Sequence, residues 1–355
     1  MKIAFILPSL DAKGPILFTR NLVIGLVDKG CECTVFYFND ITNVSFPVEC
    51  VQLNFRKCFD FSNFDIVHST MAKPDLYVAL HRKHIKAPIV TSLHCFIKED
   101  LSQTYTYIRA HLYIWVWLKA LNKITNRIMS SDYMINYYKD LIHDKKATFI
   151  KCIPYGIPDV VFKAIDDDTK GLLEGFKQKY FPVIAGCGSL IKRKGFYQLI
   201  NYLNTDVKAA VVLIGDGECY DELKQMAEKI GVKDRVLFLG FRKNSYNYYP
   251  YFDIFCMSSN SEGFGLAMLE AMSAGLPVVC SRLPIYENYF KKGDVVFFDY
   301  GNQSSFNKAI DCIKDEIELY SSAARATFTN NFTLSGMAEL HIQYYSSIIK
   351  KSCNS

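Results

Sequence analysis

Residues 260–281 read "NSEGFGLAMLEAMSAGLPVVCS", with Glu262 in a glycine-containing loop and Glu270 inside the apolar run that follows. The pattern predicts a strand, a loop and a helix in succession between residues 253 and 274. Gly275 and Pro277, just beyond, end the helix. A strand that leads through a glycine loop into a helix is typical of sheets built from parallel strands. The stretch therefore favours an α/β fold, and it raises the question of what the two carboxylates do.

The rest of the chain repeats this alternation of short β-rich apolar runs and longer segments of helical period. One set of runs, "KIAFIL", "CTVFYF", "DIVHS", "APIVTSL" and "YMINY", precedes a polar stretch at 163–180, and a second set of five follows it. We expect two doubly wound Rossmann-like domains, over residues 1–160 and 161–335, and a C-terminal helix over 336–355 that can pack back toward the first domain. Ligands in such sheets bind outside the carboxyl ends of the strands, so a cleft between the two domains is expected.

Length and composition agree with this architecture. The chain has 355 residues, more than one hydrophobic core usually serves, and 50% hydrophobic against 22% charged residues are typical of a globular protein. Twelve cysteines form no CxxC pair and no zinc-type spacing with histidine, so we expect structural thiols, the close pair Cys31 and Cys33 included. The apolar run after Met1 is too short for a signal peptide, which predicts a cytoplasmic protein.

The net charge of +5 is unevenly distributed. Residues 1–150 carry 18 Lys and Arg against 13 Asp and Glu, whereas residues 151–355 carry 23 of each kind. This asymmetry indicates a polyanionic partner for the first half, such as nucleic acid, anionic lipid or a phosphorylated substrate, or it reflects chance variation of a few charges.

The loop between the predicted strand and helix has the features of a phosphate site. Gly263 and Gly265 let the backbone approach a ligand closely, and the start of the helix offers unpaired N–H groups. Glu270, about one turn into the helix, can accept hydrogen bonds from the paired hydroxyls of a ribose, and Glu262 can meet a second polyol. A sugar on each side of a diphosphate satisfies all these groups, so the ligand expected is a nucleotide sugar. The alternative is a plain strand–helix turn that Glu262 caps.

Glu262 and Glu270, with seven residues between them, resemble the E-x7-E signature of the retaining nucleotide-sugar glycosyltransferases of family 4, which have the GT-B fold. The similarity extends over roughly 183–287, through "GSLIKRKGFYQLI" and "LPVVCSRLPIYEN", or about a third of the chain. The first half resembles the family in layout and in "DIVHS", "TSLHCF" and "IPYGIPD".

The resemblance implies a role for each matching residue. Glu262 would contact hydroxyls of the donor sugar, Glu270 would contact the ribose, and Lys194 would neutralise the diphosphate as it leaves. The backbone amides expected to face the distal phosphate and the sugar belong to Gly263, Phe264, Gly265 and Leu266.

Two positions depart from the family pattern. Ser189 stands where the family commonly has an arginine, and Arg193 and Lys192 both remain open as the second phosphate cation. Near the N-terminus "DAKGP" replaces two adjacent glycines, so that only Gly14 is left to reach the phosphate or the acceptor.

His94 ends a predicted strand and is similar to the family histidine that faces the reacting sugar, while His68 is equally consistent with a buried histidine. No carboxylate is placed to act as a covalent nucleophile. The only DxD-like run, Asp166 to Asp168, lies in a polar stretch and is expected to be surface charge, so we expect neither a divalent metal nor another cofactor. The resemblance implies that the acceptor hydroxyl attacks the anomeric carbon on the face that the diphosphate leaves, and that the configuration is retained.

The segment 105–127 combines aromatic residues, both tryptophans and basic residues, but its apolar core is far too short to cross a bilayer. Two interpretations stay open: the segment lies at an anionic membrane surface, or it is an ordinary helix that packs Trp115 and Trp117 against the sheet. A peripheral enzyme at the inner face of the membrane would meet lipid-linked acceptors. We therefore expect assembly of a bacterial surface polysaccharide such as O-antigen, capsule or lipopolysaccharide, with a UDP-linked hexose or N-acetylhexosamine as donor.

Other classes of protein are less consistent with the sequence. A Rossmann oxidoreductase needs a complete dinucleotide fingerprint, which neither "SLDAKGP" nor the loop at 215–217 supplies. A non-catalytic nucleotide-sugar-binding or scaffold protein would be expected to lose Glu262, Glu270 or Lys194, and all three are present. A nucleic-acid binder is disfavoured, because the basic residues form no dense stripe of Lys and Arg in the sequence.

Overall fold

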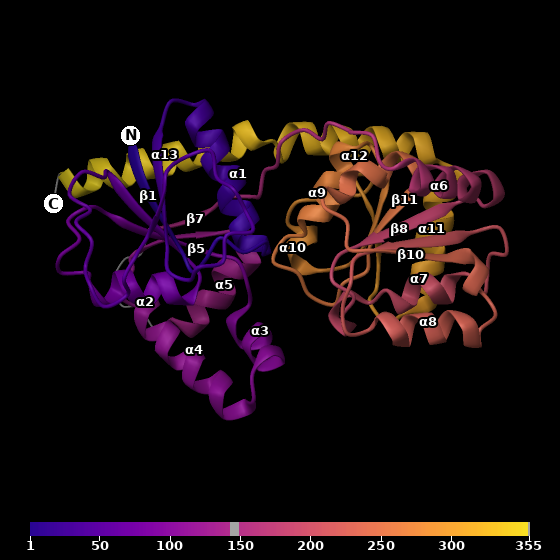
Figure 1. Cartoon of the computed structure of the whole chain (residues 1–355), viewed down its shortest axis with the longest axis horizontal. Helices are drawn as coiled ribbons and strands as arrows, with labels where there is room; N and C mark the ends of the chain where they lie inside the picture. Colours follow the sequence, from indigo (N-terminus) through magenta and orange to yellow (C-terminus); the bar gives the residue numbers. More distant parts are fainter. Residues whose placement is uncertain (143–148, 354–355) are drawn as a thin grey trace. The chain divides into compact units, whose positions relative to one another are not determined.

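The computed structural model describes residues 1–142 and 149–353 and divides the chain into two compact units. Unit 1 contains Met1–Pro158 and the chain from Phe332 onward, and unit 2 contains Asp159–Asn331. Each unit has a parallel sheet with helices on both faces (Figure 1), which confirms the predicted pair of doubly wound Rossmann-like domains. The cleft expected between them stays a prediction.

Unit 1 is built on a seven-stranded sheet in the order β3-β2-β1-β4-β5-β6-β7, with every pairing parallel. The strand order reverses between β1 and β4, the point at which such sheets open a crevice. The strands are β1 Lys2–Leu7, β2 Glu32–Tyr37, β3 Cys50–Gln52, β4 Ile66–Thr70, β5 Ile89–Leu93, β6 Asn126–Met129 and β7 Phe149–Cys152.

Helices cover both faces of this sheet, with α1 and α13 packed side by side on one face and α2 and α4 on the other (Figure 1). Gly25 allows α1 to approach α13 closely, because a Cβ there would lie 3.0 Å from the Cβ of Ala338. The helices are α1 Gly14–Asp28, α2 Ala72–Leu80, α3 Ile97–Thr104, α4 Tyr107–Leu121, α5 Asp132–Leu141 and α13 Leu334–Cys353.

The prediction that "YMINY" is a strand was wrong. These residues lie in α5, and the strand of this region is β6, which precedes them. Ser131 caps the helix by accepting a hydrogen bond from the backbone N–H of Met134 at 3.1 Å. Met134 and Tyr138, four residues apart, are both buried, as expected of one helix face.

Unit 2 repeats the doubly wound plan with six parallel strands in the order β10-β9-β8-β11-β12-β13. Its strand order reverses between β8 and β11. The strands are β8 Val183–Cys187, β9 Ala210–Ile214, β10 Val236–Gly240, β11 Ile254–Met257, β12 Val278–Ser281 and β13 Val296–Phe298.

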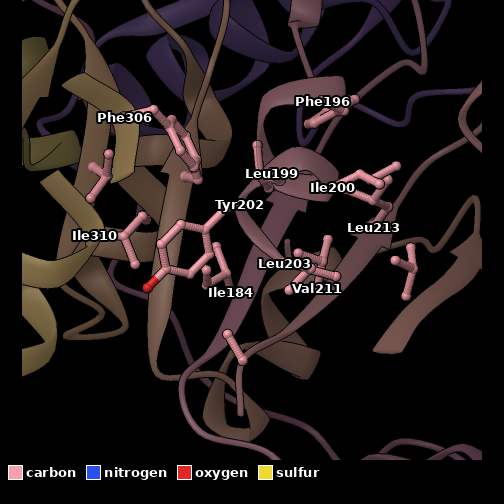
Figure 2. Close-up of a cluster of buried hydrophobic side chains, with 14 of the residues drawn as sticks. Ile184, Phe196, Leu199, Ile200, Tyr202, Leu203, Val211, Leu213, Phe306 and Ile310 are labelled. Atoms are coloured by element: carbon pink, nitrogen blue, oxygen red, sulfur yellow. The ribbon is translucent and has the colours of Figure 1, made fainter. Parts of the chain in front are cut away.

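The core of unit 2 lies where α7 and α11 pack against β8 and β9. Figure 2 shows the buried side chains of Leu199, Tyr202 and Phe306 among the strand residues, and the Tyr202 hydroxyl donates to Asp311 at 2.9 Å. The helices are α6 Asp167–Lys179, α7 Tyr197–Tyr202, α8 Tyr220–Lys229, α9 Leu266–Ser273, α10 Pro284–Glu287, α11 Gln303–Asp315 and α12 Ile317–Asn331, and the short 3₁₀ segments are η1 Lys192–Lys194, η2 Lys233–Arg235 and η3 Ser245–Tyr251.

The chain between the start of unit 2 and β8 contains a helix, and an ion pair holds its first residue. Asp166 caps α6 by accepting from the backbone N–H of Thr169 at 2.8 Å, so the DxD-like run forms a helix start. At the beginning of unit 2, the Asp159 carboxylate receives both terminal nitrogens of Arg325, at 2.5 and 2.6 Å. This bidentate pair attaches the first residue of unit 2 to α12.

Unit 1 buries two histidines between its sheet and α13. His68 in β4 contacts the Tyr345 hydroxyl at 2.6 Å and the Ser92 hydroxyl at 2.8 Å, and His341 in α13 contacts the Met337 carbonyl at 2.8 Å. Burial lowers the pKa of His341 to about 4 and, together with the charge of His341, lowers the pKa of His68 well below its usual value. Both rings are therefore neutral in the folded protein near pH 7.

We predict that unit 1 loses stability as the pH falls from 6.5 toward 4. Over this range His341 takes up a proton in the unfolded chain but stays neutral in the folded chain. Its contribution to the free energy of unfolding is therefore full above pH 6.5 and disappears as the pH approaches 4. For His341 alone, the free energy of unfolding should be roughly 2 kcal/mol lower at pH 5 than at pH 7.5. Denaturant unfolding of the wild type and of His341→Leu checks this, because the variant should depend less on pH.

His84 is exposed, so His84→Gln is the matched control and should leave the pH dependence as in the wild type. Equal pH dependence in the wild type and His341→Leu would contradict the prediction.

Candidate functional site

The candidate site lies where the strand order of unit 2 reverses. β8 and β11 are parallel neighbours, and the loops that leave their carboxyl ends, residues 188–196 and 258–265, start side by side. Two hydrogen bonds join the loops: the Asn260 N–H donates to the Arg193 carbonyl at 2.7 Å, and the Ser258 hydroxyl donates to the Lys194 carbonyl at 2.7 Å. The first loop brings basic residues to this edge and the second brings an acidic one.

Lys194 and Glu262 meet at this junction. The Lys194 ammonium lies 2.5 Å from Oε1 of Glu262, and the Ser259 hydroxyl donates to the same oxygen at 2.6 Å. The side chains are 14% and 8% exposed, so the ion pair is largely shielded from water. An ammonium has three N–H donors, so Lys194 can hold Glu262 and still donate to a ligand.

The environment of Glu262 keeps its carboxylate ionised. Burial by itself raises its pKa, but the charges of Lys194 and Arg193 and the hydrogen bonds from Lys194 and Ser259 outweigh burial, so the pKa is below its ordinary value. Glu262 is therefore an acceptor for hydroxyl hydrogens throughout the physiological range.

Glu270 has the opposite environment. It lies in α9 near the end of β8, and within residues 1–142 and 149–353 its carboxylate has no hydrogen-bond or ion-pair partner. Burial raises its pKa to about 7. A half-buried carboxylate of this kind gains from neutral O–H donors, such as the two hydroxyls of a ribose.

Glycines at two positions allow the backbone to take this shape. Gly195 has a φ of +63°, and a Cβ there would lie 2.3 Å from the Ser258 carbonyl oxygen. Gly265, at the start of α9, has a φ of +94°, and a Cβ would lie 2.9 Å from the Tyr286 hydroxyl. A side chain at either place would push the two loops or α9 out of position.

The structure brings the predicted amide segment to the start of α9. Gly263 and Gly265 are half-buried, Leu266 is the first helical residue, and the Phe264 side chain is buried against Tyr289 with ring centroids 5.2 Å apart. The predicted strand, loop and helix of this region are confirmed to within a residue or two at each end.

Arg193 is the second basic residue beside the ion pair. Its Nη1 donates to the Ser261 carbonyl at 2.5 Å and lies 3.8 Å from Oε2 of Glu262. Lys192 is exposed in the same short 3₁₀ segment, and Ser189 is exposed at the start of the loop. Of the two candidates for the second cation, the geometry favours Arg193.

His94 belongs to unit 1, directly after β5. Its Nδ1 contacts the hydroxyl of the buried Tyr155, and its ring packs against Phe18 with centroids 4.7 Å apart. Burial, with a smaller effect of the His341 charge, lowers the pKa of His94 to about 3. The ring is neutral near pH 7, so it suits a hydrogen bond to a substrate and not a positive charge.

The two other residues of unit 1 considered in the sequence analysis, Gly14 and His68, have different surroundings. Gly14 is exposed at the start of α1, where no heavy atom would come within 4 Å of an added Cβ. His68 is 1% exposed and has hydrogen-bond partners on both ring nitrogens, which identifies it as a structural histidine.

The segment 105–127 forms α4 and the start of β6, and it splits the two tryptophans. Trp117 is 6% exposed and donates to Asp75 at 2.8 Å, whereas Trp115 is 55% exposed under the Lys119 ammonium. We define the aromatic face of α4 by its large apolar side chains that are 50% to 80% exposed, together with a tyrosine just before the helix that is 41% exposed: Tyr105, Tyr107, Ile108, Leu112, Tyr113 and Trp115.

Sequence reasoning missed two residues of these sites. Ser259 could have been found, because it lies three residues before Glu262 in the same loop. Tyr155 contacts His94 across 61 residues of sequence, and no spacing pattern signals such a contact. Among the described residues, no three His, Cys, Asp or Glu side chains are grouped to hold a metal ion.

Comparison with known proteins finds glycosyltransferases. Residues 174–328 match the family model of glycosyl transferases group 1. The chain is 28% identical to the O-antigen biosynthesis glycosyltransferase WclY of Escherichia coli, over 99% of each chain. It is 27% identical to the UDP-Gal:alpha-D-GlcNAc-diphosphoundecaprenol alpha-1,3-galactosyltransferase of Escherichia coli, over 79% of this chain and 75% of that protein.

Solved structures share the fold over nearly the whole length. Anabaena Alr3699/HepE in complex with UDP aligns with a TM-score of 0.81 at 20% identity, covering 98% of this chain and 100% of that one. WaaG, a glycosyltransferase involved in lipopolysaccharide biosynthesis, aligns with a TM-score of 0.68 at 17% identity, covering 95% and 98%. Residues 174–328, which match the family model, contain both loops that meet at the Lys194–Glu262 pair, and the chain is a glycosyltransferase with the GT-B fold.

Proposed function

We propose that this glycosyltransferase moves a hexosyl or N-acetylhexosaminyl group from a UDP-sugar to a hydroxyl of a lipid-linked glycan or a lipopolysaccharide or capsule precursor, with retention of configuration. The observation that carries the proposal is the placement of an ionised, cation-paired carboxylate and an unpaired half-buried one at the same edge of unit 2. The pKa of Glu262 lies below the ordinary value for a glutamate and that of Glu270 lies above it, as expected if the two side chains serve different ligand groups.

The donor would lie across the start of α9. Glu270 would accept the ribose hydroxyls, and the amides from Gly263 to Leu266 would face the distal phosphate and the sugar. Lys194 would donate to the diphosphate with the N–H groups that Glu262 leaves free, and Arg193 would add the second positive charge in place of the family arginine. Glu262 would then hold a hydroxyl of the transferred sugar.

The chemistry follows from these positions. The bond between the anomeric carbon and the diphosphate oxygen breaks, the acceptor oxygen forms a new bond on the same face, and a diphosphate oxygen takes the acceptor proton. Lys194 and Arg193 stabilise the negative charge that accumulates on the leaving diphosphate, so no metal ion is required. His94, as a neutral ring held by Tyr155, would donate a hydrogen bond to the sugar from its Nε2.

The names of relatives support the donor and the acceptor class. The galactosyltransferase among them uses a UDP-sugar and a sugar linked to diphosphoundecaprenol, and WclY acts in O-antigen biosynthesis. The Anabaena neighbour was solved with UDP. These agree with a UDP-sugar donor and an acceptor carried by a lipid.

A lipid-linked acceptor suggests that the enzyme acts at the cytoplasmic face of the membrane. In the described parts of the chain no helix has both the length and the hydropathy to span a bilayer. The aromatic face of α4 is flanked by Arg109, Lys119 and Lys123, and residues 105–127 contain no Asp or Glu. Exposed aromatic rings beside cations suit the headgroup region of an anionic bilayer, so we propose that this face contacts the inner leaflet.

Glu270→Ala should weaken UDP-glucose binding by roughly 10- to 100-fold, because hydrogen bonds to a charged acceptor are lost. In the wild type, affinity should fall as the pH drops below 7, where Glu270 becomes protonated, and Glu270→Gln should remove this pH dependence. Calorimetry from pH 6 to 8 measures both effects. Binding that is unchanged in both variants would exclude Glu270 from the donor site.

Lys194→Gln should lower the rate at which UDP is formed from the UDP-sugar by about 100-fold or more, because the negative charge developing on the diphosphate loses its nearest cation. Lys192→Gln, which changes an exposed lysine of the same loop, should stay within about twofold of the wild type. Thermal melts of both variants separate lost turnover from lost folding. Equal rates in the two variants would contradict the assignment, and an activity that disappears with EDTA would contradict metal independence.

The double variant Ile108→Ser, Trp115→Ser should lose most of its binding to phosphatidylglycerol vesicles, because two exposed apolar side chains no longer enter the interface. Val207, 78% exposed in unit 2, provides the control variant Val207→Ser. Co-sedimentation at low and high salt measures binding. If the wild type fails to sediment with the vesicles, the membrane proposal is wrong, while the donor assignment is unaffected.

A further inference from the structure

A cavity of about 250 Å³ opens at the edge of unit 1 where β5 and β6 begin, and we call it the amino-edge cavity. It is bounded by the first residues of these strands, the chain just before each of them, and the last turns of α13. Its lining consists of Arg82, Pro88, Ile89, Lys123, Ile124, Thr125, Asn126, Ile348, Lys351 and Ser352.

The cavity is separate from the sugar-transfer chemistry. Ile89 is the first residue of β5, whereas His94 follows the last one, so the two positions lie at opposite ends of the same strand. Five residues of strand span about 17 Å. A ligand in the amino-edge cavity therefore cannot be a group bound at His94.

The charge of the lining is positive. Arg82, Lys123 and Lys351 line the cavity, and no carboxylate does among the described residues. The Arg82 guanidinium is held by the Ile85 carbonyl at 3.1 Å, and the Lys351 ammonium lies 3.9 Å from the centre of the Phe149 ring. In the part of the chain that the structure describes, none of the three cations forms a salt bridge.

Helix ends explain only part of this charge. Arg82, Lys123 and Lys351 lie at or just beyond the carboxyl ends of α2, α4 and α13, where basic residues complement the helix dipole. Each helix end carries about −0.5 of an elementary charge, so three ends contribute about −1.5 against three full positive charges. The remaining charge of about +1.5 is available to an anion.

The size of the cavity limits the ligand. Pockets that enclose drug-sized molecules have volumes of about 300–1,000 Å³, so 250 Å³ suits a compact group and not a whole nucleotide. A compact anion held by an arginine and two lysines is typically a phosphate. The geometry points to a phosphate-binding site in the amino-edge cavity, which takes either the phosphate of an anionic lipid headgroup or a soluble phosphate or diphosphate.

Two double variants of equal charge change test this site. Arg82→Gln with Lys351→Gln removes two lining cations that do not belong to the aromatic face of α4, whereas Lys83→Gln with Lys350→Gln removes two exposed lysines outside the lining. In one arm, inorganic pyrophosphate is titrated into full-length protein saturated with UDP, so that the donor site is blocked. In the other arm, the proteins are sedimented with phosphatidylglycerol vesicles, with phosphatidylcholine vesicles as the blank.

We expect the lining variant to lose at least about tenfold in affinity in one arm, and the control variant to lose less than about twofold. A selective loss for pyrophosphate identifies a soluble phosphate, and a selective loss for vesicles alone identifies a lipid headgroup. Equal losses in the two variants, or wild-type protein that binds neither ligand, would overturn the site. UDP affinity measured on the same variants keeps this result distinct from a failure of the donor assignment.

Discussion

The ion pair between Lys194 and Glu262 is the interaction on which the candidate site depends. A carboxylate that is 8% exposed needs partners that replace its lost hydration, and removing the charged partner from such a pair typically costs about 3–5 kcal/mol. The pair fixes the loop after β8 to the loop after β11 at the point where the strand order of unit 2 reverses. It also sets the net charge of the junction, because with Arg193 nearby two cations face one carboxylate and leave one positive charge for a ligand.

The contrast between the two glutamates follows from their neighbours. Both belong to one short stretch of sequence, and both are shielded from water, yet one has a pKa below the ordinary value and the other a pKa of about 7. The difference arises because Glu262 is in the loop, within reach of the basic residues, whereas Glu270 is in the helix next to Cys187 and Tyr249. One loop and the helix that follows it thus present two acceptor groups with different proton affinities.

Much of this architecture could be predicted from the sequence because it depends on local patterns. The apolar period, the glycines at 263 and 265 and the spacing of the acids specify the strand, loop and helix of residues 253–274. "YMINY" was misassigned because a short apolar run fits a strand as well as a helix, and the cap at Ser131 selects the helix. The contact between His94 and Tyr155 and the separation of Trp115 from Trp117 depend on tertiary packing, and no local pattern carries that information.

The helix α13 has a consequence for the order in which the protein is made. Unit 1 consists of an early segment and a late one, and the late segment supplies Tyr345 to His68 and packs Ala338 against Gly25. During synthesis from the N-terminus, unit 2 is complete before α13 leaves the ribosome. The nascent chain therefore carries an unfinished first half, with the binding surface for α13 uncovered, until the last helix emerges to close it.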